Sequence, residues 1–298
     1  MEVSKTPTQQ DESYPTVAAL RADYVWWVVI GVTVVMVAAI YQKALLQCWN
    51  QWWVKDSRYS HGVLVPFISL FAVYADRKKL SAIPLRPNIW IGALALLFVI
   101  VLALVSWTGG STRMEAFTFP LFLLAAVLML AGLHMARALL FPILFLSFMC
   151  PLPGFILNAT DVQIQIWSTE VAVKILRPWF DVINEGTIIK MPNITVTVAE
   201  ACSGFRMLIS IFAFSTFFAL MKEGRWWNRM LTVASALPLA LVANSLRITL
   251  IAWVGESYGE KAMHSFHDWS GYIMLVVSFV ALEFLSRLMG CRKFKSAQ

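Results

Sequence analysis

One cysteine lies where a polar stretch of the chain enters a long apolar run, and a thiol in that position can become reactive. Residues 198–206 read Val-Ala-Glu-Ala-Cys-Ser-Gly-Phe-Arg, and the cysteine is Cys202. The first N–H groups and the dipole of a helix favour a thiolate over a thiol. A thiolate is a nucleophile for acyl transfer, so Cys202 is a candidate catalytic residue, with Glu200 and Ser203 as candidates for orienting it.

An arginine inside another apolar run is the second candidate. Arg247 is expected about 12 Å from the outer end of a helix that ends near Gly255, at a rise of about 1.5 Å per residue. A guanidinium at that depth is costly unless it faces a cavity or a partner. Asn244, three residues earlier, is expected on the same helix face. We therefore predict a functional role for Arg247, with an arginine that merely bridges helices as the alternative.

A histidine on the same side of the membrane completes the set. Residues 264–271, which include His267 and Asp268, are expected to form an outer loop that runs into the last apolar run. A lone histidine near a helix end is more often a hydrogen-bonding residue than a catalyst. Together with Cys202 and Arg247, however, His267 supplies a nucleophile, a permanent cation and a titratable imidazole, which suffice for acyl transfer. The four scattered histidines and the lack of a phosphate-binding glycine loop indicate no metal or organic cofactor.

Composition places these residues in a lipid bilayer. Hydrophobic residues make up 59% of the chain and charged residues 14%, and the mean hydropathy is +0.69. These values predict an all-α polytopic membrane protein. Eight apolar runs have spanning or near-spanning length: 25–45, 61–74, 89–107, 117–133, 136–150, 203–221, 230–254 and 270–289. The second and fifth are short, so tilted, extended or re-entrant segments are alternatives to about eight transmembrane helices.

Basic residues indicate which side of the membrane each loop occupies, because lysine and arginine are retained on the cytoplasmic side. Four basic groups fall on one side of the eight runs: Arg77, Lys78, Lys79 and Arg86; His134 and Arg137; Lys222, Arg225 and Arg229; Arg292, Lys293 and Lys295. The net charge of +7 therefore requires no nucleic-acid partner. We expect a cytoplasmic tail at 1–24, one membrane domain at 25–289 with an outer insert at 151–201, and a basic cytoplasmic tail at 290–298.

The outer insert has its own periodicity. Residues 160–183 show apolar positions at mostly helical spacing, which predicts an amphipathic helix lying in the membrane interface. From Thr187 the period changes to two around Pro192-Asn193, which predicts a small β-hairpin before the sixth helix. Its apolar positions are Ile189, Met191, Ile194, Val196 and Val198. An irregular cap over the helices is the alternative.

These motifs resemble those of the exosortases, the bacterial members of the exosortase/archaeosortase group of transpeptidase-like membrane enzymes. The resemblance covers nearly the whole chain and rests on four motifs: Tyr59-Ser60-His61-Gly62 with Leu64-Val65-Pro66; Ala199 to Gly204 around Cys202; Asn244 to Ile248 around Arg247; and His267-Asp268 with Gly271-Tyr272.

The resemblance implies a multi-pass protein of the bacterial inner membrane whose active site faces the periplasm. It implies secreted protein substrates with a C-terminal sorting tail, often in hosts that make exopolysaccharide. That tail holds a short Pro-Glu-Pro-type signature, a transmembrane helix and a basic end. Cleavage would form an acyl-thioester on Cys202, which water or an unknown acceptor amine would release. By family analogy Arg247 is the proton donor and His267 the transition-state stabiliser.

The residues themselves favour a different division of roles. A guanidinium holds its proton tightly, so Arg247 is better suited to hold the oxyanion and His267 to move protons. The sequence does not choose between the two schemes. His61 is expected at the outer end of the second helix, where it lines the same pocket or, in the reading we favour, has a structural role.

Three other function classes fit the sequence less well. A thiol oxidoreductase would need paired cysteines, and Cys48, Cys150, Cys202 and Cys291 show no C-x-x-C spacing. Serine-type intramembrane proteolysis would use Ser203 and ignore Cys202. A transporter of an anion or a lipid-linked sugar would use Arg247 in a membrane cavity, but the two halves of the sequence show no repeat.

Overall fold

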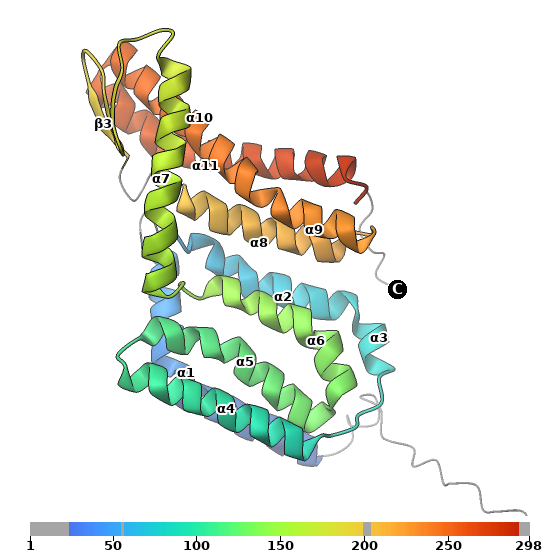
Figure 1. The fold of residues 1–298 in the computed structure, drawn as a ribbon. Helices are drawn as coiled ribbons and strands as arrows, with labels where there is room; N and C mark the ends of the chain where they lie inside the picture. The colour runs from blue at the N-terminus through green and yellow to red at the C-terminus, as the bar shows by residue number, and fades with distance from the viewer. Residues whose placement is uncertain (1–23, 55–56, 199–203, 292–298) are drawn as a thin grey trace, which may run out of the picture.

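A computed structural model describes residues 24–54, 57–198 and 204–291 of the 298-residue chain. Figure 1 shows that nearly all the helices lie roughly parallel, in a layer that runs from the N-terminal half to the C-terminal half. One helix, α7 (Gly154–Leu176), crosses the ends of the others at a steep angle and connects the two halves.

The N-terminal half contains α1 to α6. Its elements are α1 (Tyr24–Trp53), the 3-10 turn η2 (Ser60–Val63), α2 (Leu64–Ala75), the short α3 (Arg77–Ser81), α4 (Ile89–Thr108), α5 (Thr112–Ala131), α6 (Leu133–Phe145) and η3 (Leu146–Met149). Two of these helices begin with side-chain caps: Asn88 accepts a hydrogen bond from the N–H of Ile91 at 3.2 Å, and Ser111 accepts one from that of Met114 at 3.4 Å.

The C-terminal half follows α7 and a small sheet. Its helices are α8 (Phe205–Met221), α9 (Trp226–Ala234), α10 (Ala236–Tyr258) and α11 (Glu260–Leu288). A buried ion pair joins α8 to α11, because the fully buried Lys222 donates hydrogen bonds to Glu283 and, at 2.6 Å, to the hydroxyl of Ser286. A buried ammonium needs such partners. This contact therefore holds the end of α8 against α11.

Within the described residues, the eight apolar runs predicted from the sequence are mostly helical, although four of them are divided between two helical elements: 61–74, 117–133, 136–150 and 230–254. Among the described residues, four helical segments are long and apolar enough to cross a membrane: Ile89–Thr108, Thr112–Ala131, Trp226–Tyr258 and Glu260–Leu288. The pair Leu133–Met149 and Gly154–Leu176 would make a fifth if counted as one span, but it is bent by 73°. A mostly helical membrane protein with four to five candidate spans is therefore confirmed for the described residues, and the number eight stays a prediction.

The helix of the outer insert differs in its bounds from the predicted 160–183. It begins at Gly154 and ends at Leu176. Pro178 explains the earlier end, since proline lacks the N–H that would continue the helical hydrogen bonds, although Arg177 before it still has helical backbone angles. Ile183, assigned by periodicity to the helix, instead begins a strand.

The predicted hairpin is confirmed and has a third strand. Strands β1 (Ile183–Glu185), β2 (Ile188–Lys190) and β3 (Thr195–Thr197) form an antiparallel sheet in that order, in which Ile189 pairs with Asn184 and with Val196. The five predicted inward residues are all buried: Ile189, Met191, Ile194, Val196 and Val198. They pack with Ala172, Val173 and Leu176 of α7 and with Ile248, Ile251 and Ala252 of α10.

The hairpin turn is also attached to the outer end of α10. The backbone N–H of Asn193 donates to one carboxylate oxygen of Glu256 at 3.1 Å, and the Asn193 side chain donates to the other at 2.8 Å. The sheet therefore has a fixed position beside the ends of α7 and α10, and the chain returns from it toward α8.

Candidate functional site

The start of α8 is where the cysteine motif enters the helical layer. Glu200, Cys202 and Ser203 lie outside the described residues, and the description resumes at Gly204, the residue that precedes α8. Gly204 has a φ of +76°, a left-handed conformation that glycine adopts without steric cost. A long helix therefore does begin directly after the cysteine motif, as the sequence predicted.

Gly204 lies directly against the arginine motif of α10. A Cβ atom on Gly204 would lie 2.6 Å from Nδ2 and 3.0 Å from Cβ of Asn244, whose side chain is fully buried. The cysteine and arginine motifs, far apart in sequence, thus meet at this contact. Only a residue without a side chain allows α8 to begin so close to α10.

We predict that Gly204→Ala will destabilise the protein more than Gly186→Ala. Gly186 also has a positive φ, +69°, but no atom lies within 4 Å of a Cβ built there. The Gly186→Ala variant therefore measures only the cost of placing alanine in a left-handed backbone conformation, about 1–2 kcal/mol. At Gly204 the clash with Asn244 should add about 1–3 kcal/mol. Thermal unfolding in detergent measures both. If Gly204→Ala and Gly186→Ala lower Tm equally, the contact between residue 204 and Asn244 is not tight.

Arg247 is held in a fixed orientation between α10 and α11. It is buried, and it lies eleven residues before the end of α10 at Tyr258, or about 16 Å along the helix. Its Nε donates a hydrogen bond to the hydroxyl of Ser270 at 3.0 Å, and its Nη2 donates one to the carbonyl of His267 at 3.3 Å. The guanidinium therefore bridges two helices, and it also lines a cavity of about 420 Å³.

His267 lies within α11, not on a loop as predicted. The helix begins at Glu260, after Gly259 makes the turn between α10 and α11 with a φ of +86°. The prediction was wrong because the first turns of α11 are polar and extend beyond the apolar run that marked the helix. The His267 side chain is 24% exposed, and its Nδ1 lies 3.7 Å from a carboxylate oxygen of Asp268.

The cavity beside Arg247 brings several predicted residues together. Its described lining includes His61, Arg247 and Asp268 from the predicted set, together with Gly271 and Tyr272 of the histidine motif. It also includes Arg206, to which the sequence analysis gave no role. The signal was present, because Arg206 lies four residues after Cys202 and so belongs to the first helical turns after the nucleophile.

His61 lines the polar cavity and is also held by a contact with α8. Its side chain is buried, and Nδ1 shares a hydrogen bond of 3.2 Å with the hydroxyl of Ser210 on α8. The neighbouring Tyr59 accepts a hydrogen bond from the N–H of Leu152 at 2.9 Å. Burial raises the pKa of Tyr59, so its phenol stays neutral. Both residues fix η2 against the surrounding helices at the edge of the cavity.

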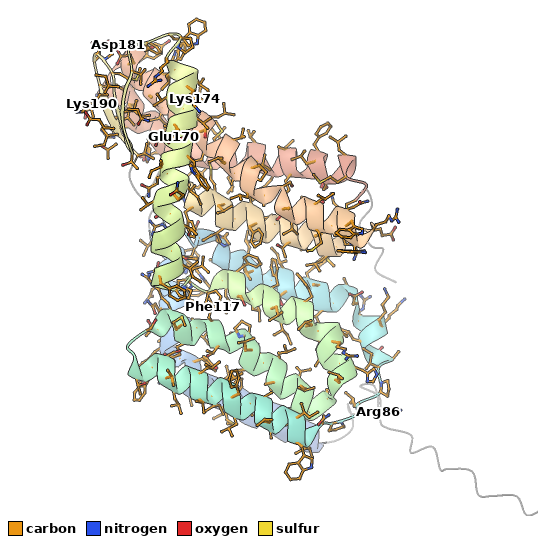
Figure 2. The ribbon with its side chains drawn as sticks, in the orientation of Figure 1. Arg86, Phe117, Glu170, Lys174, Asp181 and Lys190 are labelled. Atoms are coloured by element: carbon orange, nitrogen blue, oxygen red, sulfur yellow. The ribbon has the colours of Figure 1, made fainter. Side chains whose placement is uncertain are left out.

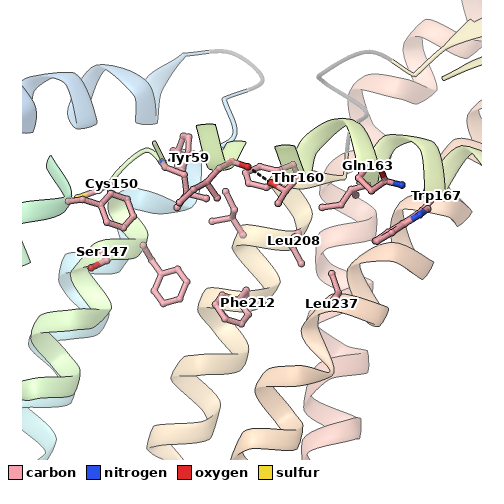
Figure 3. A pocket seen from close by; sticks show the side chains of 16 residues that line it. Tyr59, Ser147, Cys150, Thr160, Gln163, Trp167, Leu208, Phe212 and Leu237 are labelled. Carbon is pink, nitrogen blue, oxygen red and sulfur yellow. Dashed lines mark hydrogen bonds between the residues drawn. The ribbon is translucent and has the colours of Figure 1, made fainter. Parts of the chain in front are cut away.

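A second, apolar cavity lies on the opposite face of α8. It has a volume of about 690 Å³ and lies beneath α7, as Figure 3 shows. Leu208, Ile209 and Phe212 of α8 line it, whereas Arg206, Met207 and Ser210 line the polar cavity. Helix α8 therefore separates an apolar cavity from a charged one.

The described cysteines are poor candidates for thiol exchange. Cys48 of α1 and Cys150, which follows η3, belong to one buried cluster, a proximity that sequence spacing could not reveal. Cys150 donates a hydrogen bond to the carbonyl of Ala116 at 3.3 Å. Cys291 is also buried, so none of these three described thiols faces solvent.

Comparison with known proteins identifies a family for this chain. A family model described as transmembrane exosortase matches residues 49–284. The matched segment contains the three motifs around Cys202, Arg247 and His267, and it contains the polar cavity. Searches of curated proteins and of solved structures gave no match.

Proposed function

The chain belongs to the transmembrane exosortase family, and from that premise we propose that it is a membrane cysteine peptidase. Its substrates would be secreted proteins with a C-terminal sorting tail, cleaved beside the outer surface of the bacterial inner membrane. The observation that best supports this activity is that Arg247, which lines the polar cavity, donates a hydrogen bond to the carbonyl of His267, while the α8 start that follows Cys202 packs onto Asn244.

In the proposed reaction, the Cys202 sulfur attacks the carbonyl carbon of the scissile peptide bond, and a proton passes from the thiol to His267. The carbonyl oxygen becomes an oxyanion. When the C–N bond breaks, His267 returns its proton to the leaving amine, and an acyl-thioester remains on Cys202. Water or an acceptor amine then attacks the thioester, loses a proton to His267 and releases the sulfur.

Arg247 is suited to hold the oxyanion. Its guanidinium stays protonated throughout, and its contacts with Ser270 and His267 orient it before the substrate arrives. Preorganised donors of this kind stabilise the transition state strongly because they need no rearrangement. The backbone carbonyl of His267 orients Arg247. The imidazole of His267 does not take part in that contact and can transfer protons.

The distribution of basic residues supports a site on the outer side. Figure 2 shows Arg86 at one end of the helical layer and Glu170, Lys174, Asp181 and Lys190 at the other end, with α7 and the sheet. The basic groups before α4, between α5 and α6, and between α8 and α9 lie at the Arg86 end, which the positive-inside rule assigns to the cytoplasm. The insert then faces the periplasm.

The test is to co-express the chain with a tailed secreted protein from the same genome. Immunoblotting should show a shorter form of the substrate, and mass spectrometry should locate a new C-terminus at the tail. Cells with an empty vector should show the full-length form. A substrate that remains full length at every expression level would exclude the peptidase and favour the transporter.

A membrane-impermeant maleimide gives a second readout in the same cells. Since Cys48, Cys150 and Cys291 are buried, alkylation from outside should report on Cys202. Processing that stops on alkylation is expected of a cysteine peptidase whose site faces the periplasm. Processing that continues after complete alkylation of Cys202 would contradict the thioester mechanism.

A further inference from the structure

The apolar cavity beneath α7 has the size of a lipid chain rather than of a helix. Its volume is about 690 Å³, whereas a transmembrane helix about 30 Å long and 10–12 Å wide occupies on the order of 3,000 Å³. Along α8 the lining runs from Phe205 to Phe212, which is about 10 Å at a rise of about 1.5 Å per residue. That depth stays within one leaflet, since half of the hydrocarbon core is about 15 Å thick.

The cavity has a polar end beside α7 and an apolar end deeper in the helical layer. Thr160 and Gln163 of α7 line the first, and Figure 3 shows Phe212 and Leu237 farther from α7. Phe212 and Leu237 are also exposed, so the cavity opens on the apolar side of the layer, where a lipid chain can enter. A lipid has the same order of polar and apolar parts.

An arginine lies one helical turn from this cavity, toward its polar end. Arg113 precedes the lining residue Phe117 by four positions on α5, so the two share a helix face. A Cβ atom built on Gly154, where α7 begins, would lie 3.9 Å from Nη1 of Arg113. Glu115, two positions after Arg113, lies on a different helix face and interacts with Lys43. Within the described part of the chain, Arg113 forms no hydrogen bond or ion pair, so its N–H groups can bind a ligand.

The charges around Arg113 favour an anion. Arg58, Arg113 and Asp161 all act on the phenol of Tyr59, which also lines the cavity. Asp161 is already paired with Arg58, whose Nη2 lies 2.6 Å from its carboxylate oxygen. The positive charge of Arg113 is therefore the excess. The start of α7, which has no side-chain cap, adds positive potential through the helix dipole.

From these observations we infer that the apolar cavity and Arg113 form a binding site for an anionic phospholipid of the leaflet beside α7. One hydrocarbon chain fills the cavity, and the phosphate binds the Arg113 guanidinium with charge-assisted hydrogen bonds. The lipid then contacts α5, α7 and α8, and so joins the two halves of the protein. The inference is independent of the proposed peptidase, because none of the residues that line this cavity lines the polar cavity.

The test uses the full chain purified in a non-ionic detergent. The first probe is a phosphatidylglycerol that carries a photoreactive diazirine in the middle of one chain, and peptide mass spectrometry locates the label after irradiation. We expect the label on the α8 segment from Leu208 to Phe212. Native mass spectrometry with unlabelled phosphatidylglycerol then measures affinity, and the wild-type chain should bind it more tightly than phosphatidylcholine with the same chains.

Two variants examine the phosphate contact. Arg113→Gln should weaken phosphatidylglycerol binding by about tenfold, the scale of a lost hydrogen bond to a charged group. Arg177→Gln is the matched control, because it removes an exposed arginine from the other end of α7 and should leave the affinity unchanged.

Two further variants examine the chain. Leu208→Trp places a larger side chain in the cavity and should abolish the label on α8. Leu250→Trp makes the same change at an exposed position of α10 that does not line the cavity, so labelling should persist. If Leu208→Trp does not fold, the position of the label and the two arginine variants still decide the question.

Three results would overturn the site. One is a label spread over the exposed apolar helices with no preference for α8. Another is an equal loss of affinity in Arg113→Gln and Arg177→Gln, or no loss in either, which would show that Arg113 does not bind the phosphate. The third is displacement of the lipid by the transmembrane segment of a tailed substrate, which would assign the cavity to the substrate instead.

Discussion

Replacing Cys202 with alanine should abolish cleavage of the tailed substrate, with a loss of at least about 10⁴-fold in rate, as found when a nucleophile is removed from a catalytic unit. The expected cause is chemical, because the other three cysteines are buried and none can take over the attack. The amount of protein and its Tm should change little. The measurement is single-turnover processing followed by immunoblot.

Cys48→Ala is the matched control for this variant. It also removes one thiol, but from a buried cluster at the end of α1, so processing should persist. Cys202→Ser should retain the geometry with a weaker nucleophile and fall close to the alanine variant. If Cys202→Ala processes substrate at the wild-type rate, the reaction does not use a thiolate, and Ser203 becomes the residue to test.

The sequence was sufficient to predict the helices and strands that depend on local periodicity. Eight apolar runs predicted helices, and their described residues are mostly helical, although four of the runs are divided between two helical elements. Alternation around Pro192-Asn193 predicted the β2–β3 hairpin with its five buried residues, because a period of two assigns each side chain to one face. The family was likewise identified from short motifs, and the match over residues 49–284 confirms it.

Features that depend on contacts between distant segments could not be predicted. The approach of Gly204 to Asn244 requires the relative position of α8 and α10, and no local pattern contains that position. The same holds for the approach of Arg206 and Arg247 to Gly271, which involves three different helices. The start of α11 was missed as well, since its first turns are too polar to extend the apolar run that marked the helix.

Substitution of Arg247 by lysine should lower the rate of cleavage by about 10²–10³-fold, the range observed when one oxyanion donor is lost. Lysine keeps the positive charge, but a single ammonium cannot reproduce the directions of Nε and Nη2 toward Ser270 and His267. The oxyanion would then face a cation that is neither fixed nor correctly placed. We expect kcat to fall far more than KM rises, because the lost contact is made mainly in the transition state.

Ser270→Ala distinguishes this catalytic role from a brace between helices. It removes the partner of Nε but leaves the guanidinium and its contact with the His267 carbonyl in place. If Arg247 served only to join α10 to α11, both variants should lower Tm similarly and change kcat little. If Arg247 holds the oxyanion, Ser270→Ala should cost less than about tenfold in kcat, the scale of one lost hydrogen bond, while Arg247→Lys costs far more. A lysine variant within threefold of the wild-type kcat would remove Arg247 from the mechanism and leave the helix contact as its function.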